Sequence, residues 1–155
     1  MSANSFLQDK HEIEQIYIRY CELIDAKDFD KLEEVFTPDT YGHYSFSNGT
    51  SAESKDRAQL IASMHANLGK TSLCGATAHN VMNFRIRVEG DRAFAKVNYF
   101  AVHRGLGPFN GALYSMWGVY DDELVRTKSG WRVAKRNYTN ALSEGPLVTL
   151  PAAAM

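Results

Sequence analysis

The stretch that decides the fold is Ala78 to Arg104, AHNVMNFRIRVEGDRAFAKVNYFAVHR. Both of its arms are rich in β-branched and aromatic residues, and a Gly-Asp pair favours tight turns. The stretch therefore predicts two β-strands joined at Glu89-Gly90-Asp91. Polar side chains also occur in the middle of both arms, so we expect a sheet with one apolar and one polar-studded face. Such a sheet packs against a helix and still lines a pocket.

Composition limits the class of protein. The chain has 155 residues, 45% of them hydrophobic and 23% charged, which is typical of one globular domain spanning residues 1–155. A net charge of −1 argues against a nucleic-acid partner and against an anionic membrane surface. There is no apolar run of membrane-spanning length and no basic-then-apolar signal peptide, so the expected location is cytoplasmic. The cysteines Cys21 and Cys74 lack metal-ligand spacing and are expected to be reduced thiols.

Three helices are predicted. Asp9 and Glu12 resemble a capping box, and the apolar spacing that follows predicts a helix to about Ala26. A second helix is expected to start at Asp28 and to end at Thr37-Pro38-Asp39, because proline cannot continue the hydrogen-bond ladder. A third is expected over about Lys55 to Leu68, closed by Gly69.

Besides the central hairpin, alternating residues predict strands over 41–46, 112–125 and 131–140. Helices followed by a mostly antiparallel sheet indicate an α+β fold, in which a strongly curved sheet wraps the N-terminal helices into a cone with an internal cavity. The apolar tail, about 142–155, has no helical period. We expect it to pack over the pocket mouth or on a neighbouring subunit.

The candidate functional residues are acid–base side chains. Signatures of phosphate loops, serine hydrolases and zinc peptidases are absent, and no metal site is expected. The candidates are Tyr20, Asp25, Tyr44, His79, Tyr99, His103 and Arg136. Each also has an ordinary structural interpretation: a tyrosine in the core, a hydrogen-bonded histidine, or a charged group in solvent.

Their order along the chain resembles a known family. The pattern consists of Tyr20-Cys-Glu-Leu-Ile-Asp25, Phe36-Thr-Pro-Asp, Tyr44 before Ser47-Asn48-Gly49, Ala78-His79-Asn80 and Trp131-Arg-Val-Ala-Lys-Arg136-Asn137. From about Asp9 to Asn140 it is similar to the SnoaL-like branch of the nuclear-transport-factor-2-like superfamily. Within that branch it looks most like scytalone dehydratase, bile-acid dehydratase and hexachlorocyclohexane dehydrochlorinase. The superfamily also contains isomerases, epoxide hydrolases, dioxygenase small subunits and non-enzymes.

The resemblance implies roles for single residues. Asp25 and His79 stand where those enzymes carry a catalytic Asp–His pair, while Tyr20 and Tyr44 stand where the bile-acid dehydratase pattern has tyrosines. The dehydrochlorinase has lysine in place of Tyr20, so this site is less suited to a chloride leaving group. Arg136 resembles the dehydrochlorinase's arginine. His103 matches the second histidine of scytalone dehydratase by approximate spacing.

These residue types suit proton transfer at carbon. An imidazole near neutral pKa removes a proton, and a carboxylate orients it and stabilises the imidazolium. Arg136, His103 and Tyr99 are then expected to bind substrate, and no cofactor is required. The resulting hypothesis is a cofactor-independent dehydratase-type lyase or isomerase that acts on a hydrophobic ring substrate of steroid, polyketide or aromatic-degradation type.

Two alternatives remain: a non-catalytic ligand-binding or assembly module, and the small subunit of an aromatic-ring dioxygenase. A buried Asp25–His79 contact beside an open cavity would favour the enzyme, and a filled cavity the module. The family resemblance and the outer-face aromatics Phe94, Phe100 and Trp117 predict a homodimer or homotrimer formed through the sheet.

One geometric condition concerns the two histidines. With a two-residue turn at Gly90-Asp91, simple alternation places His79 and His103 on opposite faces of the sheet. Both face one cavity only if a β-bulge intervenes, because a bulge shifts the facing by one residue.

Overall fold

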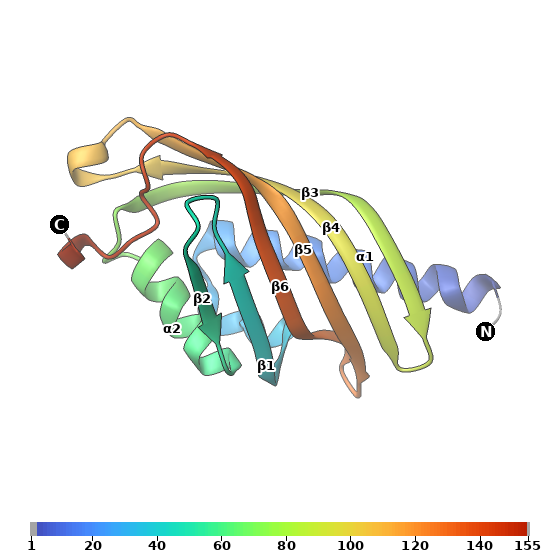
Figure 1. The fold of residues 1–155 in the computed structure, drawn as a ribbon. Helices are drawn as coiled ribbons and strands as arrows, with labels where there is room; N and C mark the ends of the chain where they lie inside the picture. Colours follow the sequence, from blue (N-terminus) through green and yellow to red (C-terminus); the bar gives the residue numbers. More distant parts are fainter. Residues whose placement is uncertain (1–2, 155) are drawn as a thin grey trace.

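A six-stranded sheet curves around one long helix in the computed structural model, which describes residues 3–154 (Figure 1). The strand order is β2-β1-β6-β5-β4-β3, with β1 and β6 parallel and every other pair antiparallel. The elements are α1 (Ala3–Ala26), η1 (Phe29–Glu34), β1 (Phe36–Ser45), β2 (Ser51–Ser54), α2 (Arg57–Leu68), β3 (Cys74–Glu89), β4 (Arg92–Gly105), η2 (Gly107–Phe109), β5 (Leu113–Thr127), β6 (Gly130–Glu144) and η3 (Ala152–Ala154). The predicted α+β class with a curved, mostly antiparallel sheet is confirmed.

Helix α1 supplies the core of the cone. Ile13, Tyr17, Tyr20 and Ile24 recur at helical spacing and are all buried against the sheet. Burial of each such side chain contributes about 1.5–3 kcal/mol, so this face holds the helix in place. The predicted end at Ala26 is confirmed, but the helix begins at Ala3, ahead of the expected cap.

Asp9 is therefore not a capping residue. It is buried inside α1, where Trp131 Nε1 donates to its carboxylate at 3.2 Å and Arg126 forms an ion pair at 2.8 Å. A carboxylate followed three residues later by glutamate is compatible with a cap. Here the Asp9 carboxylate instead accepts from two residues that are distant in sequence and belong to the β5–β6 hairpin.

The predicted second helix is wrong beyond its first turns. A short 3₁₀-helix, η1, is followed directly by strand β1, and Pro38 lies inside that strand. The β1–β6 register shifts between Phe36 and Tyr41, which is where a strand accommodates proline. Strand β2, which pairs with β1 after the turn at Ser47-Asn48-Gly49, was not predicted.

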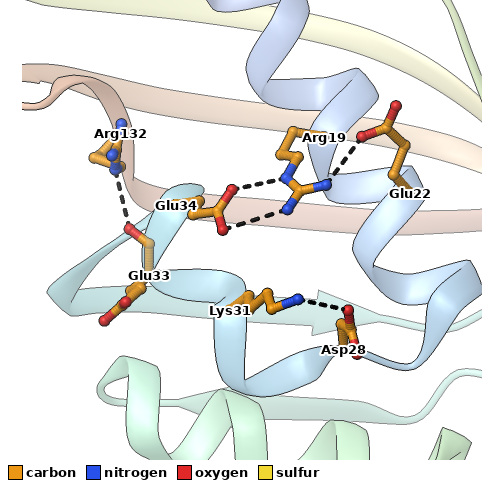
Figure 2. Close-up of polar contacts among 7 residues, drawn as sticks. All are labelled: Arg19, Glu22, Asp28, Lys31, Glu33, Glu34 and Arg132. Carbon is orange, nitrogen blue, oxygen red and sulfur yellow. Dashed lines mark hydrogen bonds and ion pairs between the residues drawn. The ribbon is translucent and has the colours of Figure 1, made fainter.

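Ion pairs fasten η1 to its neighbours (Figure 2). The Arg19 guanidinium of α1 donates to Glu34 at 2.7 and 3.3 Å, and Lys31 pairs with Asp28 at 3.0 Å. From β6, Arg132 Nε donates to the Glu33 carbonyl at 3.0 Å. These contacts fix the connection between α1 and the sheet.

The β3–β4 hairpin has the predicted two-residue turn and two register shifts, and the one nearer the turn decides which way His79 faces. Glu89 pairs with Arg92 around Gly90-Asp91, and Gly90 has φ +63°. The register then shifts by one residue between Met82 and Arg85, where Asn83 adopts φ +57°. Beyond this bulge His79 pairs with Ala101 and Thr77 pairs with His103. The bulge thus turns His79 to the inner face that His103 also occupies.

The C-terminal tail packs on the connection between α2 and β3. Leu73 N donates to the Leu150 carbonyl and Ala152 N donates to the Thr71 carbonyl, both at 2.9 Å. Val148 is fully buried in the core. The tail therefore closes this end of the cone against its own chain (Figure 1).

Candidate active site

Asp25 and His79 form a direct contact at one end of the cone. His79 Nδ1 lies 2.7 Å from Asp25 Oδ1, and the His79 backbone N–H donates to Oδ2 at 2.9 Å. The Thr77 hydroxyl donates to Oδ1 at 2.7 Å. The side chain of Asp25 is 30% exposed and that of His79 only 8%. The pair is thus largely shielded from water but not sealed.

The end of α1 places the carboxylate. Lys27 has φ +58°, and the Asp28 N–H donates to the Leu23 carbonyl at 2.9 Å, which is the geometry of a left-handed helix end. Asp25 lies just before this end, where the helix dipole disfavours a negative charge. The three donors from β3 offset that cost and hold the carboxylate against the sheet.

The same donors decide the charge of Asp25. Burial raises the pKa of its carboxyl, but hydrogen bonds from the His79 ring, the His79 N–H and Thr77 outweigh burial and lower the pKa below its usual value. Asp25 is therefore ionised at neutral pH and only accepts. His79 Nδ1 must carry the proton, which leaves a lone pair on Nε2 of the neutral ring.

His103 adjoins this pair. Its ring meets the His79 ring edge to face, with centroids 5.2 Å apart, and its Nδ1 donates to the Tyr114 carbonyl at 3.3 Å. Burial and the neighbouring His79 lower the pKa of His103 to about 4. His103 is therefore neutral at physiological pH, and its Nε2 is an acceptor.

Arg136 is deeply buried and already paired. It donates from Nε and Nη2 to Asp122, at 3.1 and 2.8 Å, and both side chains are at most 1% exposed. Tyr17 donates its hydroxyl to the same carboxylate at 2.9 Å. The guanidinium carbon lies 4.5 Å from the Tyr20 ring centroid and 4.2 Å from that of Tyr120. Arg136 thus anchors the aromatic interior.

The remaining predicted tyrosines belong to that interior. The Tyr44 ring lies 5.5 Å from the Tyr138 ring, and the Tyr99 hydroxyl donates to the Tyr138 hydroxyl at 2.6 Å. Burial raises the pKa of Tyr20, of Tyr44 and of Tyr138, and raises that of Tyr99 to about 12. All four hydroxyls are protonated at neutral pH, and the Tyr99 proton is donated to the Tyr138 hydroxyl.

Gly118 makes the Tyr99–Tyr138 contact possible. The two tyrosines come from β4 and β6, with β5 between them, and Gly118 lies on β5 below the Tyr99 ring. A Cβ at this position would come within 2.7 Å of the Tyr99 ring and hydroxyl. Only glycine lets the ring cross β5 and stack on Tyr138.

The SnoaL-like domain family matches residues 5–137, which is most of the chain. The chain belongs to the SnoaL-like family. An uncharacterized Mycobacterium tuberculosis protein is 32% identical over 139 residues, covering 89% of each chain.

Solved structures share the fold of this SnoaL-like protein, which is that of the nuclear-transport-factor-2-like superfamily. A protein from Novosphingobium aromaticivorans, provisionally named a scytalone dehydratase, has a TM-score of 0.80 at 18% identity, with 97% of this chain and 95% of that chain covered. Hexachlorocyclohexane dehydrochlorinase from Novosphingobium barchaimii has a TM-score of 0.77 at 15% identity, with 94% of each chain covered. At these identities the likeness establishes the fold alone.

The structure thus brings together Asp25, His79 and His103, and separately gathers Tyr20, Tyr44, Tyr99 and Arg136 in the interior. The sequence-based prediction missed Thr77 and Tyr138. Each could have been found by alternation, because Thr77 lies two residues before His79 and Tyr138 two residues after Arg136. It also missed Asp122, whose pairing with Arg136 depends on the β5–β6 register.

Two surface clefts of this SnoaL-like protein lie away from the Asp25–His79 pair. A cleft of about 510 Å³ lies beside the β3–β4 hairpin, and one of about 350 Å³ lies between η1, β1 and the β5–β6 turn. The internal cavity beside the pair stays a prediction. Within residues 3–154 no cluster of His, Cys, Asp or Glu is arranged to hold a metal, and no helix there is both long and apolar enough to cross a membrane.

Proposed function

We propose that this protein is a cofactor-independent dehydratase-type lyase, or a related isomerase, that acts on a hydrophobic ring substrate. The fold and its neighbours indicate ligand binding or dehydratase- or isomerase-type chemistry. The observation that carries the finer proposal is the contact between Asp25 Oδ1 and His79 Nδ1 at 2.7 Å.

In the proposed reaction His79 Nε2 is the base. It removes a proton from a carbon next to a carbonyl group, and the electron pair left behind forms the new double bond. The ionised Asp25 stabilises the imidazolium as it forms, while its contact with Nδ1 keeps the productive tautomer. A positioned general base of this kind contributes about 10²–10⁴ in rate.

The outcome depends on where the proton goes next. In a dehydration, the C–O bond at the neighbouring carbon breaks and the departing hydroxide takes a proton, so that water leaves. The proton comes from the imidazolium directly, or from a tyrosine hydroxyl that the imidazolium then reprotonates, and His79 is neutral again. In an isomerisation, the imidazolium returns the same proton to a different carbon. A neutral tyrosine hydroxyl such as that of Tyr44 supports either course, because it donates to a carbonyl oxygen whose negative charge grows.

His103 and Arg136 then have different tasks. Neutral His103 offers Nε2 as an acceptor for a substrate hydroxyl, since its Nδ1 already donates to the Tyr114 carbonyl. Arg136 is neutralised by Asp122, so its role in this proposal is to hold Tyr20 and Tyr120 in position.

A second candidate function is ligand binding without catalysis. It is favoured by the dense aromatic packing of the interior, in which Tyr99 stacks on Tyr120 at 4.8 Å and on Tyr138 at 5.2 Å between centroids. A protein of this kind would bind a ring ligand in the same cone without using His79 as a base.

The deciding experiment screens hydroxylated ring ketones for dehydration and for double-bond isomerisation. The chain offers a matched control, because His65 also contacts an aspartate, Asp30, at 2.9 Å but on the exposed surface. We expect His79→Ala to abolish turnover and His65→Ala to leave it unchanged. Turnover by His79→Ala at the wild-type rate would refute the mechanism. Ring ketones that bind but are never converted would favour the binding module.

A further inference from the structure

The cleft of about 510 Å³ lies far from the Asp25–His79 pair. Phe6 and Lys10 from the first turns of α1 line it, together with residues of the β3–β4 hairpin. Lys10 and Asp25 stand on the same helix about 22 Å apart, at 1.5 Å per residue. Figure 1 shows the N-terminal turns of α1 beside the closed end of that hairpin. This cleft is therefore separate from the candidate active site.

The charge of the cleft is unlike that of the whole chain. Its lining includes four cationic side chains and a single carboxylate, Asp121, although the net charge of the chain is −1. The cations are Lys10, Arg85, Arg87 and Lys96. An anion that enters the cleft thus meets a locally positive field.

Two of these cations face each other directly. Arg85 and Lys96 are cross-strand partners in the β3–β4 register, and like charges in that position destabilise a sheet. Arg87 is paired with Glu89, and Lys10 lies 3.8 Å from Glu14. No ion pair among residues 3–154 includes Arg85 or Lys96, although Asp121 is the other cross-strand neighbour of Lys96. An anion between them would relieve their repulsion.

The rest of the lining is apolar and aromatic, but it is divided between the two faces of the edge strand. Phe94 lies on the same face of the sheet as Arg85 and Lys96, with the Arg87 guanidinium carbon 4.4 Å from its ring centroid, whereas Phe84 and Ile86 lie on the inner face that packs against the core. The volume is within the range of small-molecule sites, ~300–1,000 Å³. One aromatic ring, Phe94, beside two cations without ion-pair partners fits a ligand that combines a ring with a negative charge.

We propose that this cleft binds an aromatic carboxylate. The carboxylate contacts Arg85 and Lys96, and the ring packs on Phe94, which lies on the same face of the sheet. A small molecule fits better than an added peptide strand. The cleft lies next to the bulge between Met82 and Arg85, and the αL backbone of Asn83 interrupts the edge that such a strand would need.

A simpler account is that basic residues on the edge strand β3 only deter edge-to-edge association. The two accounts differ in one respect. Protection of an edge requires charge but no affinity for a ligand, whereas a binding site requires saturable binding that depends on both charge and ring.

The test is calorimetric titration with 2-naphthoate, with the neutral 2-naphthamide as the matched ligand. We expect saturable binding of the naphthoate, at least about tenfold weaker binding of the amide, and weaker naphthoate binding as salt rises. Arg85→Gln and Lys96→Gln should each weaken naphthoate binding about tenfold or more. Lys128→Gln, an exposed lysine in the β5–β6 turn, should have no effect.

Four kinds of result would overturn the proposal. One is the absence of saturable naphthoate binding. Another is equal affinity for the naphthoate and the amide, or wild-type affinity in the Arg85→Gln/Lys96→Gln double variant. The third is binding that is lost in His79→Ala but kept in Arg85→Gln, which would assign the ligand to the active site instead. An acidic peptide that binds where naphthoate does not would also overturn it.

Discussion

His79 and His103 meet edge to face, with ring centroids 5.2 Å apart and an interplanar angle of 87°. Two imidazoles at this distance cannot both be charged without repulsion. The pKa of His103 is lowered to about 4, first by burial and then by His79; Lys27 also lowers it, while the Asp25 charge opposes the shift. His103 is therefore the neutral member of the pair, and a proton acquired during turnover resides on His79 beside Asp25.

This assignment predicts how stability depends on pH. The unfolded chain binds a proton at His103 near pH 6.5, while the folded protein does so only near pH 4. Between these values the unfolded state holds more protons, so the free energy of unfolding decreases as pH falls from 6.5 to 4. The loss due to His103 is on the order of 3 kcal/mol. The lowered pKa of Asp25 adds to it at still lower pH.

The measurement is urea unfolding of the wild type and of His103→Gln at pH 7 and pH 5. The variant should lose less stability between the two pH values, because it lacks the titrating group. His65→Gln, an exposed histidine, should follow the wild type. An equal loss in His103→Gln and wild type would mean that His103 titrates normally in the folded protein.

The next prediction concerns Asp25 and its second donor. Asp25→Asn keeps the shape of the side chain but removes the charge that stabilises the imidazolium, and we expect turnover to fall about 10²–10⁴-fold. Thr77→Val should reduce turnover less. It should also raise the pH at which activity appears, because the Thr77 hydroxyl helps to lower the pKa of Asp25. Thr77→Ser, which keeps the hydroxyl, should restore the wild-type pH profile. A profile that is identical in Thr77→Val would show that Thr77 only fills space.

How far the sequence predicts this site can be judged from single residues. The resemblance places Asp25 and His79 as a pair and apolar spacing predicts the helix end near Ala26, and the structure brings the two side chains into contact. The sequence shows that a bulge is needed if His79 and His103 are to face one cavity. It does not show that the bulge lies at Asn83, because the flanking residues are compatible with a regular strand. Pro38 indicates a helix stop from local sequence, because proline cannot continue the hydrogen-bond ladder. The local sequence does not show that β6 pairs with this segment and makes it a strand. The pairing of Asp122 with Arg136 depends on the β5–β6 register, which only the folded sheet defines.

The hydroxyl groups of the interior should contribute unequally. Tyr44→Phe and Tyr20→Phe each remove one donor, and loss of one donor to a developing negative charge typically costs about 10²–10³ in rate. Tyr138→Phe also removes the acceptor of the Tyr99 hydroxyl, so it should disturb binding as well as turnover. Steady-state kinetics of the three variants on an identified substrate would separate kcat from KM. Wild-type kinetics in all three would exclude the tyrosines as donors.

Arg136 should affect stability more than chemistry. Arg136→Met leaves the buried Asp122 carboxylate without its ionic partner, which costs about 3–5 kcal/mol in comparable sites. The double variant Arg136→Met/Asp122→Leu removes both charges and should recover much of that loss. Chemical unfolding followed by circular dichroism measures both effects. If Arg136→Met were as stable as the wild type but inactive, Arg136 would instead be a substrate-binding residue.

The last prediction concerns assembly. On the outer face of the sheet Phe100 pairs with Trp117, their ring centroids 5.0 Å apart, and Trp117 pairs with Leu142, which is 57% exposed. An apolar row of this kind is typical of a surface that another chain covers, and we expect a dimer or trimer formed through it. Light scattering at micromolar concentration should give a multiple of the 17.4 kDa chain mass, and Leu142→Glu should shift it toward the monomer. Leu7→Glu, an exposed leucine on α1, is the control and should leave the mass unchanged. A monomer mass for the wild type would refute assembly through the sheet, and an unchanged oligomer in Leu142→Glu would place the contact elsewhere.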